Sequence, residues 1–298
     1  IFLIMKKELI DIIVVCGRHG ANYAKILRKT GEMLKSNHYQ LNWNCITTPK
    51  YREVPDGFVK LHDLEPTSSD GGIIHGEGLV AGIRESSAKY VLITDSDIIL
   101  LRENWDLKLV KKLQGNTIIV GFEWGGEFEK ECYQGFPCTT FSLFDGEIVR
   151  PMNINLVQGA QCHTVKLKNE KTASLFNSRA GKNLILETGW RLPLRLKRAG
   201  YKGHTLKKIV PFDKRSNLKW APKDLANHDP SHPYRTRVRW IAKKAGNHVM
   251  HEFYLDKELF ASHMRRSRKY GITNKMTEAW LNKIKIYLKD KYGKKLKI

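Results

Sequence analysis

The stretch that decides the fold is YVLITDSDIILL, from Tyr90 to Leu101, an apolar run interrupted by Asp95 and Asp97. A continuous apolar run of this kind is typical of a strand buried inside a parallel sheet. Side chains alternate between the two faces of a strand, so carboxylates two residues apart would point the same way. Adjacent anions repel, and a divalent cation removes that repulsion, so the pattern predicts a metal site at the strand's C-terminal end. A turn in which each Asp accepts backbone N–H bonds is the structural alternative.

Strands and helices alternate on both sides of this stretch. Apolar runs at Asp11–Gly17 and Trp43–Thr48 predict buried strands, and helical spacing predicts helices over Asn22–Leu34 and Gly76–Ser86. This alternation indicates a mostly parallel sheet with right-handed crossovers. Ligands bind such sheets beyond the C-terminal ends of the strands, which is where the two aspartates fall.

The chain after residue 110 predicts further elements of the same domain. Strands are expected at Thr117–Phe122 and Thr139–Asp145, and a helix from Glu187 to Gly200. Pro193 suits only the first turn of that helix, and Gly200 suits its C-terminal cap. We therefore interpret residues 8–255 as one α/β domain and residues 256–298 as a basic helical C-terminal extension.

The positive charge of the chain is concentrated in its last third. The net charge is +22, and the segment Arg195–Ile298 holds 28 Lys and Arg against 8 Asp and Glu, a net +20. Such a surface favours a polyanionic partner, either nucleic acid or an acidic membrane surface. A solvated, lysine-rich helical tail is the alternative.

The apolar runs and the cysteines of the sequence bear on membrane insertion and on the cellular compartment. No apolar run approaches the roughly 18 to 20 uncharged residues of a membrane span, so no transmembrane segment is expected. The 5 cysteines are odd in number and scattered, without the paired spacing of a zinc ribbon. They predict reduced thiols in a cytoplasmic protein.

Taken together, these features resemble the GT-A glycosyltransferases, particularly family-2-like enzymes. The resemblance covers roughly residues 8–255. It is carried by the βα start, the string Lys89–Asp97, Trp105, and a later helix headed by an acid and followed by Gly200 and Tyr201. It implies a GT-A fold, a mostly parallel, Rossmann-like sheet flanked by helices. It also implies an enzyme that moves a sugar from a nucleotide-sugar donor to an acceptor hydroxyl.

The resemblance further implies roles for three carboxylates. Asp97 matches the acid that ligates Mn²⁺ or Mg²⁺ on the donor diphosphate, and Asp95 the one nearer the ribose or a metal-bound water. A nucleoside diphosphate leaves poorly until a cation takes up its developing charge. Glu187 matches the general base of the inverting members, although a carboxylate at a helix N-terminus is also an ordinary cap.

Other parts of the donor site are less defined by the resemblance. The family often adds a late histidine to the metal ligands; His251 is the expected residue, with His248 and His228 as alternatives. The acid that reads the nucleobase has no match in the second strand, and Asp63 is its expected substitute. Arg18, after the first strand, is expected to reach a phosphate or to be a surface charge. The base and the sugar therefore stay open.

Two other enzyme classes that use paired aspartates fit the positions of these residues less well. A phosphatase with an Asp nucleophile needs its acids after the first strand, which here ends in Cys16-Gly17-Arg18. A polymerase-like two-metal site needs another carboxylate on a neighbouring strand, which Asp145 or Glu123 would supply only if the fold happened to bring it close.

A non-enzymatic nucleic-acid-binding protein fits the mixed basic and aromatic run Tyr234–Trp240 but leaves Asp95 and Asp97 unexplained. For an enzyme, a polyanionic acceptor such as hydroxymethylated DNA would suit the charge. The rival acceptor is a growing glycan at an anionic membrane.

Overall fold

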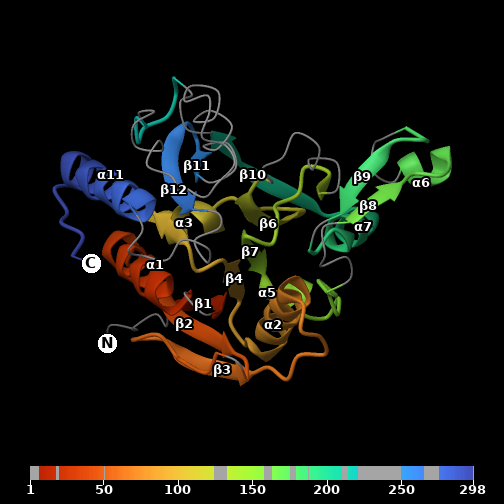
Figure 1. The fold of residues 1–298 in the computed structure, drawn as a ribbon, viewed down its shortest axis with the longest axis horizontal. Coiled ribbons are helices and arrows are strands. Elements are labelled where there is room, and N and C mark those ends of the chain that lie inside the picture. The colour runs from red at the N-terminus through yellow and green to blue at the C-terminus, as the bar shows by residue number, and fades with distance from the viewer. Residues whose placement is uncertain are drawn as a thin grey trace, which may run out of the picture. The chain divides into compact units, whose positions relative to one another are not determined.

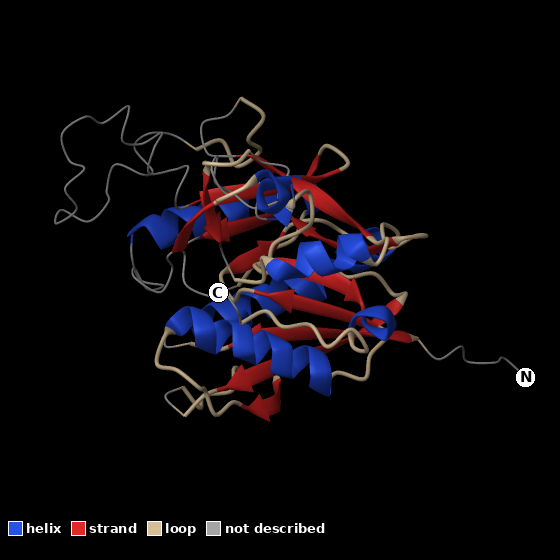
Figure 2. Cartoon of the chain, turned by 90° about the vertical axis from the view of Figure 1, so that its right-hand side faces the viewer, coloured by secondary structure: helices blue, strands red, loops and turns tan. Residues whose placement is uncertain are grey.

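The computed structural model describes ten stretches of the chain, which form two compact units. The described residues are 7–17, 20–49, 51–123, 133–157, 163–174, 179–186, 188–209, 214–220, 250–264 and 275–297. Unit 1 comprises Ile1–Cys16, Ser36–Asp95 and Asp106–Leu206, and unit 2 comprises Gly17–Lys35, Ser96–Trp105 and Lys207–Ile298. Both units combine helices with strands (Figure 1, Figure 2). The α/β fold class expected from the sequence is confirmed.

Unit 1 is built on a sheet with the strand order β3-β2-β1-β4-β7-β6-β10. The parallel strands are β1 (Glu8–Val15), β2 (Tyr39–Thr47), β3 (Val59–Asp63) and β4 (Tyr90–Thr94). The next strand in the sheet, β7 (Phe141–Asp145), is antiparallel to both of its neighbours, β4 and β6 (Thr117–Phe122). Strand β10 (Lys202–Ile209) pairs parallel to β6, and its residues Lys202–Leu206 belong to unit 1. Because β1 to β4 run parallel, their C-terminal ends meet at one edge of the sheet.

The described part of unit 1 also contains helices and a small hairpin. They are α2 (Gly71–Glu85), α3 (Trp105–Val110, from Asp106 on), α5 (Gly146–Val149), α6 (Glu170–Ser174), α7 (Arg191–Arg198), and the antiparallel pair β8 (His163–Lys166) and β9 (Asn183–Leu186). The core joins apolar residues of β1, β2, β4 and β6 to one face of α2 and to Leu192 and Leu196 of α7. Burial of these continuous apolar runs explains why the sequence predicted the strands so directly.

Helix α2 lies close on β1 because two glycines face that strand. A Cβ on Gly78 would lie 2.8 Å from Cγ2 of Val15, and a Cβ on Gly82 would collide with the side chain of Ile13. Asp70 caps the helix by accepting from the backbone N–H groups of Gly72 at 2.9 Å and Ile73 at 3.1 Å. The start of α2 is therefore fixed both along its axis and against the sheet.

Two thiols lie side by side at the C-terminal ends of β1 and β2. The Sγ atoms of Cys16 and Cys45 are 2.8 Å apart, and both side chains are buried. Both are free cysteines, as is the buried Cys138. The neighbouring thiol and burial raise the pKa of Cys16 far above its usual range.

Unit 2 combines an antiparallel sheet with two long helices. The sheet runs from Lys207–Ile209 of β10 through β11 (Met250–Leu255) and β12 (Glu258–Met264) to β5 (Ile98–Leu100). The helices are α1 (Gly20–Leu34) and α11 (Lys275–Tyr292). Trp280 of α11 is buried and donates its indole N–H to Oγ of Ser262 on β12 at 2.8 Å. This contact holds the helix on the sheet.

Several expected elements lie where the sequence placed them, and others differ in their bounds. Pro193 lies in the first turn of α7, and Gly200 follows its C-cap with a φ of 81°. The expected boundary at residue 255 falls between β11 and β12, which pair with each other in unit 2. Residues 256–298 therefore contain a strand as well as a helix. In the part of the chain that the structure describes, no helix has the length and apolar character needed to span a membrane.

Candidate metal centre

The two aspartates lie in a turn that follows β4. The strand ends at Thr94, and Ile98 begins β5, which pairs with β12. The acids therefore lie beyond the C-terminal end of the strand, as expected, but in a turn and not on one face of an extended strand. The turn is held by two hydrogen bonds: the N–H of Asp95 donates to the Thr140 carbonyl at 2.8 Å, and Oγ1 of Thr94 donates to the Asp95 carbonyl at 3.0 Å. The backbone of the first acid is thus fixed at the edge where β1 to β4 end.

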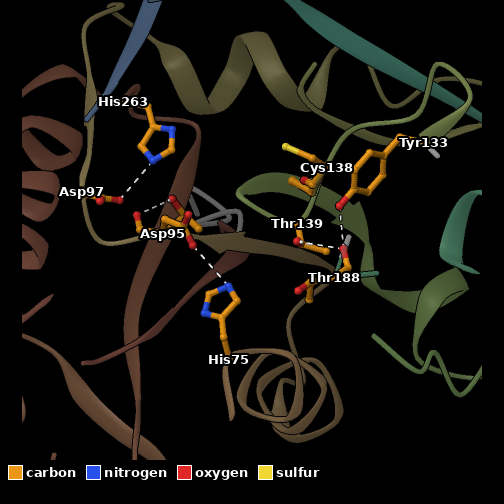
Figure 3. Close-up of polar contacts among 10 residues, drawn as sticks. His75, Asp95, Asp97, Tyr133, Cys138, Thr139, Thr188 and His263 are labelled. Atoms are coloured by element: carbon orange, nitrogen blue, oxygen red, sulfur yellow. Dashed lines mark hydrogen bonds and ion pairs between the residues drawn. The ribbon is translucent and has the colours of Figure 1, made fainter. Parts of the chain in front are cut away.

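His263 of β12 approaches the second acid. Its Nε2 lies 3.3 Å from Oδ1 of Asp97, and the N–H of Met264 donates to the Asp97 carbonyl at 3.1 Å. The side chains of Asp97 and His263 are only 12% and 5% exposed, so their charges are poorly screened by water. Strand β12 therefore holds both the backbone and the carboxylate of Asp97 (Figure 3).

Three ligand atoms converge at this turn. One atom each from Asp95, Asp97 and His263 lie within 4.8 Å of one another. Opposite ligands of an octahedral Mg²⁺ lie about 4.2 Å apart, since each bond is about 2.1 Å long. Carboxylates suit Mg²⁺ and Mn²⁺, and a neutral imidazole is a common ligand of transition metals. The donor set and its spacing therefore fit a divalent cation after small side-chain adjustments.

A second histidine lies against the first acid. Nε2 of His75, in the first turns of α2, is 3.3 Å from Oδ1 of Asp95, and the His75 side chain is 15% exposed (Figure 3). Cys138 lines the same region, and burial, assisted by the negative charge of Asp95, raises its pKa to about 11. Cys138 is therefore a neutral thiol at neutral pH and adds no charge beside the aspartates.

His251 does not belong to the three-atom group found among the described residues. It lies on β11 directly opposite His263, with 6.1 Å between the ring centroids. Sequence reasoning missed His263 because β12 lies in the segment interpreted as a helical extension. Two short apolar runs, Phe253–Leu255 and Leu259–Ala261, separated by the polar residues Asp256–Glu258, were the signal for a hairpin that would have placed His263 on a strand.

Asp63 lies at the same edge of the unit 1 sheet as Asp95. It ends β3, and with strands about 4.8 Å apart it lies roughly 14 Å from the end of β4, three strands away. Its carboxylate accepts from Nζ of Lys60 and Oγ1 of Thr47, and these bonds lower the pKa of Asp63. An ionised acid at that distance is placed to meet the far end of an extended ligand.

The other predicted positions lie outside the described residues. They are Glu187, Arg18, His248, His228 and the Tyr234–Trp240 run. The residue after Glu187 is described. The Thr188 carbonyl accepts from Oη of Tyr133 at 2.7 Å and from Oγ1 of Thr139 at 3.4 Å (Figure 3). The turn that leads into α7 is therefore anchored.

Comparison with known proteins gives matches among solved structures. No protein-family model and no curated protein matches the chain. It is similar to a mannosyltransferase from Pyrobaculum calidifontis in complex with GDP-Man and Mn²⁺, at 11% identity and a TM-score of 0.37, over 62% of this chain and 58% of that one. This chain thus spans less than two thirds of that protein.

Two other solved structures cover more of the chain. Mouse xyloside xylosyltransferase 1 matches at 10% identity and a TM-score of 0.42, over 68% of this chain and 86% of its own. A galactosyltransferase, LgtC, in complex with donor and acceptor sugar analogs, matches at 10% identity and a TM-score of 0.42, over 92% and 95%. At these values, the interpretation of the site depends on the geometry of this chain's own residues.

Proposed function

We propose that this protein is a metal-dependent glycosyltransferase that moves a sugar from a nucleotide-sugar donor to an acceptor hydroxyl. The observation that carries the proposal is the convergence of Asp95, Asp97 and His263 after β4. Open α/β sheets bind their ligands at this edge. A donor diphosphate is itself anionic, so it would be repelled by two carboxylates unless a cation lay between them.

The roles of the described residues follow from this placement. Asp95, Asp97 and His263 would hold Mn²⁺ or Mg²⁺, which when bound neutralises the charge that develops on the diphosphate leaving group. Asp63, at the same edge of the unit 1 sheet as Asp95, is proposed to accept hydrogen bonds from the nucleoside. His251 would support His263 from the neighbouring strand, since the two residues are paired across β11 and β12 and their ring centroids lie 6.1 Å apart.

Two roles rest on the sequence alone. Glu187 is proposed as the base that takes the proton from the acceptor hydroxyl, which corresponds to inversion at the sugar. Arg18 is proposed to contact a donor phosphate. A glutamate here can act as a base only within hydrogen-bond reach of the acceptor.

The acceptor is proposed to be a polyanion, such as DNA that carries hydroxymethylated bases. The support is the net +20 of Arg195–Ile298. A glycan at an anionic membrane is the alternative acceptor. Labelled donor supplied with hydroxymethylated duplex DNA or with anionic vesicles carrying glycan separates the two: label in the DNA favours the first, and label confined to glycan favours the second.

The donor reaction itself can be tested without knowing the acceptor. The purified chain is incubated with a panel of nucleotide sugars, and release of nucleoside diphosphate is measured with Mn²⁺, with Mg²⁺ and with excess EDTA. Slow hydrolysis of one donor is expected with metal and none with EDTA. Asp97→Ala and His263→Ala should abolish it, whereas His62→Ala should not, because His62 pairs with Glu85 at the other end of α2. Equal hydrolysis in EDTA would overturn the proposal.

A further inference from the structure

We propose that His75 is a positioning residue, which holds the Asp95 carboxylate in the orientation that binds the metal. The inference rests on the metal-dependent function proposed above. Its starting observation is the 3.3 Å contact between Nε2 of His75 and Oδ1 of Asp95. Among the described residues, His75 is not part of the three-residue group that could hold a cation, so no cation would lie between its Nε2 and the carboxylate. That nitrogen therefore carries a proton, since two acceptors would repel. The imidazole therefore donates from Nε2.

The packing of α2 explains why His75 reaches this position. His75, Gly78 and Gly82 are spaced at three and four residues, so they share one helical face. Gly82 lies over Ile13, and Gly78 lies over Val15, the last residue of β1. Helix α2 and strand β1 therefore run in opposite directions, and the N-terminus of α2 lies at the C-terminal end of β1. Three residues before Gly78, about 4.5 Å further along the axis, the same face has passed the end of the strand.

The register of the sheet places Asp95 at that same point. Val14 of β1 lies opposite Thr94 of β4, so Asp95 directly follows the last paired residue of β4. His75 projects past the end of β1 and meets the neighbouring strand's first turn residue. The contact between His75 and Asp95 therefore depends on the close packing of α2 against β1 that Gly78 and Gly82 allow.

The position of His75 is also rigid. Asp70 caps the helix, and the carboxylate of Glu77 accepts from the N–H of Thr67 at 3.1 Å. Gly76 lies against the segment between α5 and β8, where a Cβ would be 3.2 Å from the Leu156 carbonyl oxygen. An imidazole on such a support can hold a neighbouring side chain in one orientation.

The backbone of Asp95 is already fixed by Thr140 and Thr94, so its side-chain torsions are what remains to be set. The N–H of His75, held against one carboxylate oxygen, sets these torsions and therefore also the direction of the second oxygen. Groups that orient metal ligands in this way commonly change metal affinity about 10- to 100-fold when they are removed. We expect His75 to have an effect of that size.

The test measures Mn²⁺ affinity directly, on the full chain and without donor, from the electron paramagnetic resonance signal of free Mn²⁺. His75→Leu should weaken Mn²⁺ binding about 10- to 100-fold. His75→Gln should restore most of the affinity, since its amide N–H can occupy the place of Nε2–H. His62→Leu is the matched control: it removes the contact, at 3.8 Å, between His62 and Glu85 at the far end of α2, and should leave Mn²⁺ affinity unchanged.

Activity and unfolding separate positioning from a structural role. For a positioning residue, His75→Leu raises the Mn²⁺ concentration needed for half-maximal donor hydrolysis while kcat at saturating Mn²⁺ stays within a few fold. Loss of structure would instead lower the Tm and the active fraction without changing the affinity of the folded molecules. Wild-type affinity in His75→Leu overturns the inference.

The same measurements keep the two proposals apart. Wild-type protein that binds no divalent cation contradicts the metal-dependent function and this inference with it. Weaker Mn²⁺ binding in His75→Leu, together with no turnover of any nucleotide sugar, supports the role of His75 and contradicts the glycosyltransferase.

Discussion

Substituting Gly78 by alanine should weaken metal binding from a position that touches no ligand. The new Cβ would lie 2.8 Å from Cγ2 of Val15, 3.1 Å from its Cγ1 and 3.4 Å from Cγ2 of Ile46. Carbon atoms pack best at about 3.5 to 4.0 Å, so relief of the closest contact needs a movement of about 1 Å. Three methyl groups from two strands surround the site, so one rotamer change cannot provide that relief. We expect α2 to move away from β1.

That displacement has two measurable consequences. Over-packing costs about 1 to 3 kcal/mol and the glycine-to-alanine change in a helix returns about 1 kcal/mol, so the free energy of unfolding should fall by roughly 0 to 2 kcal/mol. The same 1 Å carries His75 out of hydrogen-bonding distance of Asp95, which now stands at 3.3 Å. Mn²⁺ affinity should therefore drop toward that of His75→Leu.

The assay pairs denaturant unfolding with the Mn²⁺ titration, and Gly71→Ala is the control. A Cβ on Gly71, also in α2, would meet nothing within 4 Å, so that variant should keep both stability and affinity. Full Mn²⁺ affinity in Gly78→Ala, together with the expected loss of stability, would refute the reasoning that the glycine contact places His75.

Three further predictions test the site and the fold. Asp97→Ala should abolish sugar transfer, because losing the cation raises the barrier by several kcal/mol; transfer that survives at saturating Mn²⁺ would show that another group binds the metal. Glu187→Gln should lower turnover by about 10² to 10⁴-fold with donor affinity retained, measured by single-turnover kinetics and donor titration; a parallel loss of donor affinity would make Glu187 a donor ligand, since the N-cap of α7 is Trp190. Burial raises the pKa of Glu252, so its protonated form favours the folded state, and that stability is lost as pH rises through the folded pKa. The unfolding free energy of Glu252→Gln relative to wild type should therefore rise as the pH increases above the ordinary carboxyl pKa of about 4.3, and a pH-independent difference would contradict this.

The parts of the fold that sequence reasoning predicted well are those with local signals. The apolar run that becomes β1 and the helical spacing that becomes α1 are legible within a window of a few residues. The pair Asp95 and Asp97 was found for the same reason, although its backbone is a turn and not a strand. The site's histidines depend on contacts between distant segments.

His263 and His75 illustrate the two kinds of information that a local pattern lacks. His263 meets Asp97 because β12 pairs with β5, across more than 150 positions of the chain, and strand pairing over such a separation leaves no short-range trace. His75 meets Asp95 because Gly78 and Gly82 seat α2 at one height on β1. The glycines were visible, but the side chains they approach were known only once the sheet order was known.

The buried thiols at the end of β1 and β2 offer a way to time the opening of this edge of the sheet. Cys16 and Cys45 are 2% and 0% exposed, so an alkylating reagent cannot reach either sulfur while the strands are paired. The raised pKa of Cys16 also keeps its thiol protonated and therefore unreactive. Modification must wait for the strands to part, and its rate under native conditions reports the free energy of that local opening. Mass-resolved alkylation of the two peptides, with and without a nucleotide-sugar donor, would show how strongly an occupied site locks the ends of these strands.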